Sequence, residues 1–151
     1  MKSMETKAKS PVVMDASGLI LGRLSSDIAK RLLEGEDVVI VNAEKAVISG
    51  KRLSRVKIAR EFLEVGLYRQ GPFHRRRPDQ IVRRVIRGML PWSKARGKQA
   101  YRRLKVFIGI PDEMKDRSFE TIPDANAQKL KCSYFTVGEF AKEIGWNVSG
   151  E

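Results

Sequence analysis

Apolar positions in the first fifty residues alternate between runs typical of strands and a spacing typical of a helix. The stretch PVVMDA (11–16) predicts a short strand. The stretch DVVIVNAE (37–44) predicts a strand buried on both faces, because its apolar run is continuous, short and β-branched. Between the two, apolar residues recur every four positions, at Leu24, Ile28 and Leu32. Strand, helix and strand in this order predict a βαβ unit with parallel strands.

The next apolar positions predict a strand at AVISG (46–50) and a helix at KRLSRVKIAREFLEVG (51–66). The apolar residues of this second helix are interpreted as one broad stripe: Leu53, Val56, Ile58, Phe62 and Leu63. The stripe is expected because an α/β domain needs helices to cover its sheet.

A third helix, strongly basic on one side, is predicted within HRRRPDQIVRRVIRGMLP (74–91). Pro78 suits the first helical position, Asp79 suits its positive end, and Pro91 stops the helix. One face is apolar, formed by Ile81, Val82, Val85, Ile86, Met89 and Leu90. The opposite face carries Arg83, Arg84 and Arg87.

Such a helix fits a membrane surface, a target peptide of a partner protein, or a core helix with a basic outer face. The aliphatic face, which lacks Trp and Phe, favours the third interpretation. No apolar run approaches the roughly 20 residues of a transmembrane helix.

The remaining pattern predicts a helix at SKARGKQAYRRL (93–104), with Ser93 as its N-cap, and a strand at LKVFIGI (104–110). The chain is then loop-like and acidic until a last short helix in TVGEFAKEIGW (136–146). Thr136 and Glu139 there form a capping box.

Together these elements predict one α/β domain at residues 11–151, behind a flexible basic N-terminal tail at residues 1–10. Its sheet is expected to be small, parallel or mixed, with about four strands.

Charge is concentrated in one part of the chain. Residues 69–105 hold 13 Lys and Arg against one acid, a net charge of +12, which equals the net charge of the whole protein. Ten of the 13 are arginines, whose planar fork binds phosphate oxygens and stacks on bases. With Phe73 and His74 beside Arg75, Arg76 and Arg77, this composition favours folded RNA as the partner.

Candidate catalytic groups are few. His74 stands beside three arginines and is interpreted as a stacking or hydrogen-bonding group rather than a base, and Cys132 as a buried structural thiol. The glycines of SGLILGR (17–23) match neither nucleotide-binding motif and are interpreted as turn residues, although a nucleotide-binding enzyme remains the alternative. The acids of PDEMKD (111–116) are interpreted as a solvated loop. No metal and no cofactor is expected.

Three stretches carry a family resemblance: residues 12–50 with DASGLILGRL and VNAE, residues 84–111 with RGMLP and RLKVFIGIP, and GEFAKEIGW (138–146). In this order and spacing they resemble the ribosomal protein L-thirteen family of the large subunit, in its archaeal and eukaryotic form. The resemblance implies a three-layer α/β/α domain in the cytoplasmic ribosome. It implies binding to large-subunit ribosomal RNA beside neighbouring ribosomal proteins, a role in early subunit assembly, and no catalysis, membrane or small-molecule substrate.

The basic region around GMLP in that family maps here to Arg84, Arg87, Lys94, Arg96, Lys98, Arg102 and Arg103. Composition adds further candidate RNA contacts: Arg69, His74, Arg75, Arg76, Arg77 and Arg83. The loop GPFHRRRPDQI (71–81) departs from the family pattern, as does the segment 112–133, to which no RNA contact is assigned. A regulator that binds RNA outside the ribosome stays open as a side role.

Overall fold

The computed structural model of the 151-residue protein describes residues 11–67 and 69–147, so the predicted tail at 1–10 lies outside the described residues. The strands are β1 (Val12–Asp15), β2 (Val38–Val41), β3 (Val47–Ser49), β4 (Leu104–Val106) and β5 (Tyr134–Thr136). The α-helices are α1 (Leu21–Glu34), α2 (Arg52–Glu64), α3 (Pro78–Met89), α4 (Ala95–Arg102) and α5 (Val137–Glu143). Short 3-10 helices are η1 (Ala43–Lys45), η2 (Asp112–Met114), η3 (Pro123–Ala125) and η4 (Ala127–Lys129).

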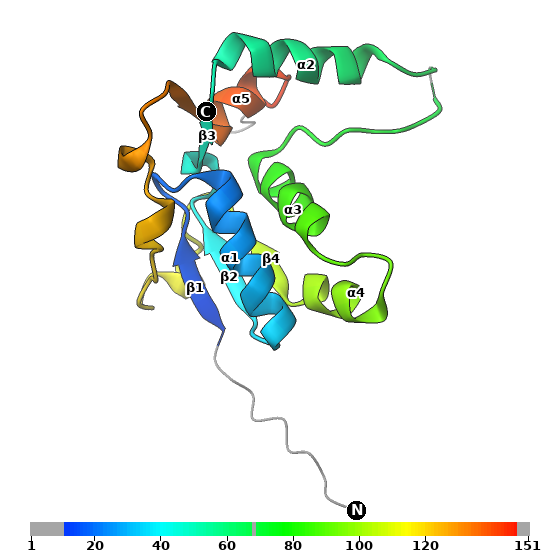
Figure 1. Ribbon diagram of the computed structural model, residues 1–151. Coiled ribbons are helices and arrows are strands. Elements are labelled where there is room, and N and C mark those ends of the chain that lie inside the picture. The colour runs from blue at the N-terminus through cyan, green and yellow to red at the C-terminus, as the bar shows by residue number, and fades with distance from the viewer. Residues whose placement is uncertain (1–10, 68, 148–151) are drawn as a thin grey trace, which may run out of the picture.

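The strands divide into two sheets. β1, β2 and β4 form a parallel sheet with β2 in the middle, and β3 pairs with β5 in a separate antiparallel sheet (Figure 1). The register places Val13 beside Val39 and Ile40 beside Val106. The predicted α/β class and the parallel βαβ unit are therefore confirmed, with strands shared between a sheet of three and a sheet of two.

Strand β2 is buried on both faces, as its continuous apolar run predicts. Val38 and Ile40 face the core beneath α1 and α3, whereas Val39 and Val41 pack in a second cluster with Phe107 and other apolar side chains of the following loop. That second face is covered by irregular chain after β4 rather than by α-helices. This layer differs from the three-layer α/β/α expectation because the acidic segment forms only 3-10 turns.

Helix α1 forms the centre of the helical layer and contacts both α3 and α4. Its four-residue repeat of Leu24, Ile28 and Leu32 is fully buried, as predicted. The helix ends at Gly35, which has a φ of 100°, a left-handed conformation that glycine adopts without strain.

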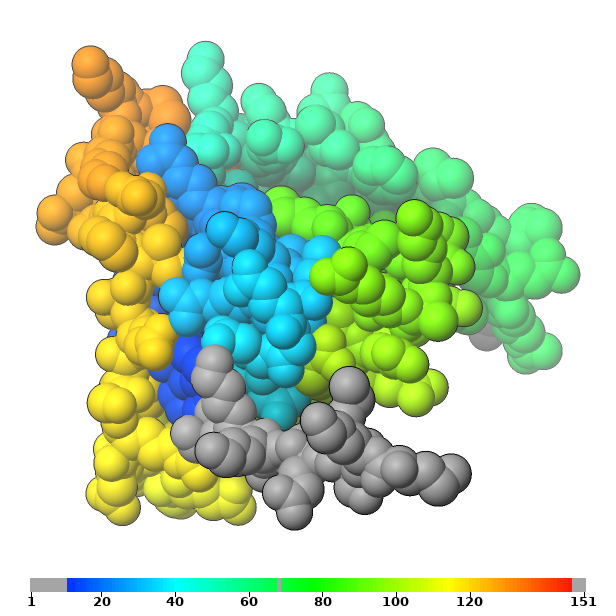
Figure 2. All heavy atoms as spheres, turned by 60° about the horizontal axis from the view of Figure 1, so that its bottom comes forward, coloured from blue at the N-terminus to red at the C-terminus, as the bar shows by residue number. Residues whose placement is uncertain are grey.

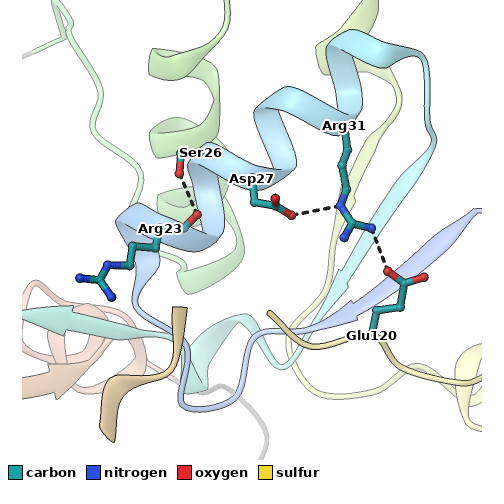
Figure 3. A network of polar contacts seen from close by, with 5 residues as sticks. All are labelled: Arg23, Ser26, Asp27, Arg31 and Glu120. Atoms are coloured by element: carbon teal, nitrogen blue, oxygen red, sulfur yellow. Dashed lines mark hydrogen bonds and ion pairs between the residues drawn. The ribbon is translucent and has the colours of Figure 1, made fainter. Parts of the chain in front are cut away.

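An ion network on the outer side of α1 ties this helix to the segment beside β1 (Figure 3). Arg31 donates from Nε to Asp27 at 3.0 Å and from Nη1 to Glu120 at 2.8 Å. The hydrogen bond to Glu120 raises the pKa of Arg31 against the opposing effect of burial, and the charge of Asp27 adds to the increase. The acidic segment is thus attached to the domain although it lacks long helices.

A second polar network lies where β1 and β2 end. The carboxylate of Asp15 accepts hydrogen bonds from the Asn42 amide at 3.0 Å and from the Ser17 N–H at 2.9 Å. Burial alone would raise the pKa of Asp15, but these hydrogen bonds, with the charge of Lys45, outweigh it and lower that pKa. Asn42 itself has a φ of 54°, so the amide helps to fix an uncommon backbone turn.

The apolar stripe predicted for α2 is not a core face. Only Val56 is buried on this helix, whereas Leu53 is 78% exposed and Phe62 is 60% exposed. The helix is predicted correctly, but it extends away from the sheet and contacts the domain mainly through α5 (Figure 1). The salt bridge from Arg52 to Glu143, at 2.9 Å, belongs to that contact.

Three smaller predictions also differ from the structure. The N-cap of α4 is Lys94, one residue after Ser93, and it makes no side-chain capping bond. Strand β4 ends at Val106. The Phe107 N–H still bonds to the Ile40 carbonyl of β2, but the Gly109 N–H bonds to the Glu44 carboxylate and Ile110 reaches solvent. Cys132 is exposed, not buried, because its segment lies on the surface before β5.

The capping box of α5 is confirmed. The Thr136 hydroxyl accepts a hydrogen bond from the Glu139 N–H, and the Glu139 carboxylate accepts one from the Thr136 N–H, both at 3.2 Å. Ile144 is buried at the end of this helix and Phe140 is half-buried.

Candidate nucleic-acid interface

Helix α3 presents arginines outward because its apolar face packs on the core. Val82 and Ile86 are fully buried beneath it, and Pro78 occupies the first helical turn as predicted. Arg84 and Arg87 are exposed on the other side. Within the described residues, no helix is long and apolar enough to cross a membrane. The apolar face of α3 has its partner inside the domain, which favours the predicted core helix with a basic outer surface.

Helix α4 is held against the end of α3 by a close contact at Gly97. A Cβ at this position would overlap the carbonyl oxygen of Pro91, so only glycine lets α4 approach the turn between the helices. This approach fixes three exposed cations on the outside of α4, namely Lys94, Lys98 and Arg102. None of the three side chains has a salt bridge or hydrogen bond to the described parts of the chain.

Two arginines of α3 lie over aromatic rings between α3 and α4. The Arg87 guanidinium lies 4.1 Å from the Trp92 ring centroid, and the Arg83 guanidinium lies 4.9 Å from that of Tyr101. The two rings meet edge to face at 5.3 Å. These contacts hold the arginine side chains in place without neutralising their charge.

The loop before α3 is joined to α3 and α2 by polar and aromatic contacts. The Nδ1 of His74 lies 2.8 Å from Nη1 of Arg84, and its ring meets the Phe62 ring edge to face at 5.9 Å. His74 therefore has the stacking and hydrogen-bonding surroundings predicted for it. Arg75 donates to Gln80 at 2.7 Å, and Arg77 pairs with Asp79 at 3.2 Å.

Two predicted RNA contacts, Arg96 and Arg103, form hydrogen bonds to the end of α1. Arg96 donates to the carbonyl of Leu33 at 3.0 Å, and Arg103 donates to that of Leu32 at 2.6 Å. Both carbonyls belong to the last turn of α1, where positive charge is favourable. These two arginines thus cap α1, and Arg103, which is half-buried, has the more enclosed position.

The two remaining candidate RNA contacts, Arg69 and Arg76, lie in the loop between α2 and α3. Arg69 adopts a left-handed conformation with a φ of 70°, and Arg76 packs against Gly145 near the end of α5. The thirteen predicted residues therefore fall into a loop group at 69–77, a group on α3 and a group at 94–103. Figure 2 shows the chain of α3 and α4 (yellow-green) along one flank of α1 (blue to cyan), with the yellow chain after β4 on the opposite flank. The basic helices thus share one side of the molecule, away from the acidic segment.

A groove of about 880 Å³ lies between α2 and α3 and brings part of this set together. It is lined by His74, Arg75, Arg83, Arg84 and Arg87 from the predicted set. Sequence reasoning missed Arg55, Phe62 and Tyr101, which also line it. The available signal was the composition of α2, where four basic residues stand among apolar ones, but the helix was interpreted as covering the sheet.

The first four residues of SGLILGR form a turn before α1, and their N–H groups have partners in the chain. The N–H of Gly18 bonds to the carbonyl of Lys45, and that of Ile20 to the carbonyl of Ala125. A phosphate loop needs such donors to point at its ligand. The turn interpretation holds for Gly18, which has a φ of 67°, but it is wrong for Gly22, which lies in the first turn of α1. In the part of the chain that the structure describes, no group of three or more His, Cys, Asp or Glu side chains is placed to hold a metal ion.

Comparison with known proteins gives one consistent result. The family model described as "Ribosomal protein L13" matches residues 9–113. The large ribosomal subunit protein uL13 of Methanosarcina barkeri is 52% identical over 135 residues, covering 88% of this chain and 96% of its own length. The uL13 proteins of Archaeoglobus fulgidus (49% identical, 89% of this chain and 87% of theirs) and Saccharolobus solfataricus (40%, 95% and 99%) are similar over comparable lengths.

Proposed function

The chain belongs to the ribosomal protein L13 family, and we propose that it is a structural, non-catalytic constituent of the large ribosomal subunit in the cytoplasm. Residues 11–151 act as one domain whose basic region, residues 69–105, faces ribosomal RNA. Neighbouring ribosomal proteins are its other partners. A role early in subunit assembly is part of the same proposal.

The RNA contact is inferred from a set of basic side chains that have no described partner within the protein. Lys94, Lys98 and Arg102 are exposed on α4, which Gly97 holds in a fixed position. A rigid row of unpaired cations matches the phosphate backbone of a folded RNA, since each neutralised phosphate releases counterions. Arg84 and Arg87 add exposed positive charge on α3, although they contact His74 and Trp92 respectively.

The test is association with the large subunit in cells. The triple variant Lys94→Gln, Lys98→Gln, Arg102→Gln removes three exposed charges that contribute no internal contact. We expect it to co-sediment poorly with large subunits in high-salt gradients. The matched control is Lys30→Gln, Lys131→Gln, Lys142→Gln, which removes three exposed lysines outside residues 69–105. Equal recovery of both variants with the large subunit would contradict the proposed surface.

The enzyme alternative has a separate test. If SGLILGR bound a nucleotide, ATP or a dinucleotide would raise the melting temperature of the isolated protein in a saturable way. We expect no such increase, because the N–H groups of Gly18, Leu19 and Ile20 already bond to chain carbonyls. Stabilisation at micromolar nucleotide would restore the alternative.

A further inference from the structure

The groove between α2 and α3 combines two properties that the outer surface of α4 does not share. Its α2 wall presents Ile58 and Phe62, and the loop adds Phe73. Its α3 wall presents Arg84 and Arg87. Flat aromatic rings therefore face guanidinium groups across a groove whose volume lies within the range of sites for small organic groups.

Two aromatic side chains of the groove are unusually open to solvent. Phe73 is 81% exposed and Phe62 is 60% exposed. The one described ring contact of these two residues is the T-shaped contact between Phe62 and His74, with ring centroids 5.9 Å apart. Exposed large aromatic residues that cluster in a hollow indicate a binding surface rather than a gap in the core.

The charge of the groove is of one sign. Five arginines line it, namely Arg55, Arg75, Arg83, Arg84 and Arg87, and no carboxylate is among its lining residues. A purely apolar protein segment would bury these charges without partners, which is costly. The occupant must therefore supply negative charge and flat apolar faces together.

An unpaired nucleotide has both. Its phosphate accepts hydrogen bonds from the guanidinium fork, and its base stacks on a phenyl ring. A base inside a duplex has its faces covered by its neighbours, so the aromatic wall discriminates between paired and unpaired RNA, whereas the exposed cations of α4 reach phosphates of either.

We propose that this groove is a binding site for unpaired nucleotides of the RNA, which stack on Phe62 and Phe73 while the arginines hold their phosphates. This proposal rests on the proposed function, because the RNA is the ribosomal RNA bound by residues 69–105. The proposal also divides the RNA-binding surface into two parts. The cations of α4 bind the RNA backbone, and the groove binds a segment of the RNA whose bases are unpaired.

The experiment measures the affinity of the full-length protein for two RNA stems of one sequence, one of which carries three additional unpaired adenosines. We expect the wild type to bind the stem with unpaired adenosines about tenfold more tightly, because only an unpaired base can stack on an exposed phenyl ring. The double variant Phe62→Leu, Phe73→Leu keeps apolar side chains but removes the rings, and it should bring the ratio of the two affinities close to one.

The matched control is Leu53→Ala, which changes an exposed apolar residue of α2 that does not line the groove. It should keep the tenfold ratio, and thermal unfolding should be unchanged in both variants because these side chains are exposed. A ratio of one in the wild type, or a tenfold ratio that survives the loss of both rings, would overturn the groove proposal. So would selective displacement of the stem with unpaired adenosines by a helical peptide rich in Glu and Leu, which would assign the groove to a protein.

A different result would show that the proposed function itself is wrong. In that case the variant Lys94→Gln, Lys98→Gln, Arg102→Gln would bind both stems as tightly as the wild type. If that variant weakens both stems equally while the aromatic change has no effect, only the groove proposal is wrong.

Discussion

Neighbouring arginines in this protein have different roles, and their environment decides which. Arg102 is exposed and has no internal partner, whereas the adjacent Arg103 is half-buried and donates to the Leu32 carbonyl at the end of α1. Composition identified the basic region but could not separate the two, because both carry the same charge in the same stretch. The separation depends on which side of α4 faces α1, and that follows from the tertiary packing.

This division leads to a paired prediction. Arg103→Gln removes a charge-assisted hydrogen bond to a helix end, so the free energy of unfolding should fall by about 1.5–3 kcal/mol. Arg102→Gln should leave the free energy of unfolding within about 0.5 kcal/mol of the wild type. Chemical denaturation measures both. A smaller loss for Arg103→Gln than for Arg102→Gln would contradict the capping role.

Asp15 gives a prediction on pH. Its pKa is lower in the folded protein than its ordinary value, so its carboxylate stabilises the fold fully above the unfolded pKa of about 3.9. This contribution is lost as the pH falls through the folded pKa. Asp15→Asn should therefore be less stable than the wild type at pH 6 but should lose less stability on acidification.

Denaturation in urea at pH 6 and pH 3.5 checks this expectation. Asp116→Asn, which changes an exposed carboxylate with no described partner, is the control and should lose stability with acid as the wild type does. If Asp15→Asn showed the same loss between the two pH values as the wild type, the network of Asp15, Ser17 and Asn42 would not be what stabilises this turn.

At the scale of elements, the buried face was predicted correctly for helices with one clear apolar stripe. It was predicted wrongly for α2, whose apolar residues lie on several sides. The four-residue repeat of α1 and the apolar face of α3 are buried as expected. On α2, a rotation of about 100° per residue separates Leu53 from Phe62 by about half a turn, so its apolar residues never formed one face. The sequence could have shown this, but not that α2 extends from the domain beside a groove.

Helix α4 shows a contact that no periodicity reveals. Gly97 lies inside the helix, where it weakens helix formation, and the structure explains it by the close approach of Pro91. Gly97→Ala should lower the free energy of unfolding by about 1–3 kcal/mol and displace α4.

The control for this change is Gly88→Ala, since a Cβ at position 88 in α3 would meet no neighbouring atom within 4 Å. That change should be neutral or stabilise the protein by up to about 1 kcal/mol. Thermal denaturation of the two variants compares them directly. Equal stability of Gly97→Ala and Gly88→Ala would show that the contact with Pro91 does not constrain α4.

At the scale of the whole molecule, α3 and α4, which carry much of the charge excess of residues 69–105, lie on one side, with the acidic segment on the opposite flank (Figure 2). The sequence predicted the size of this charge excess, and the match to the ribosomal protein L13 family supports RNA as its partner. The sequence could not predict that α2 would contribute Arg55 and Phe62 to the groove. These residues reach it only because the loop between α2 and α3 brings the two helices to a common groove.

The salt dependence of RNA binding tests the central claim most directly. The logarithm of the affinity for a large-subunit RNA fragment should fall linearly with the logarithm of salt concentration, with a slope set by the number of neutralised phosphates. For Lys94→Gln, Lys98→Gln, Arg102→Gln, the slope should be smaller in magnitude by about 2–3 than for the wild type. The control variant Lys30→Gln, Lys131→Gln, Lys142→Gln should keep the wild-type slope. Equal slopes for all three proteins would contradict the claim that the side formed by α3 and α4 binds the RNA.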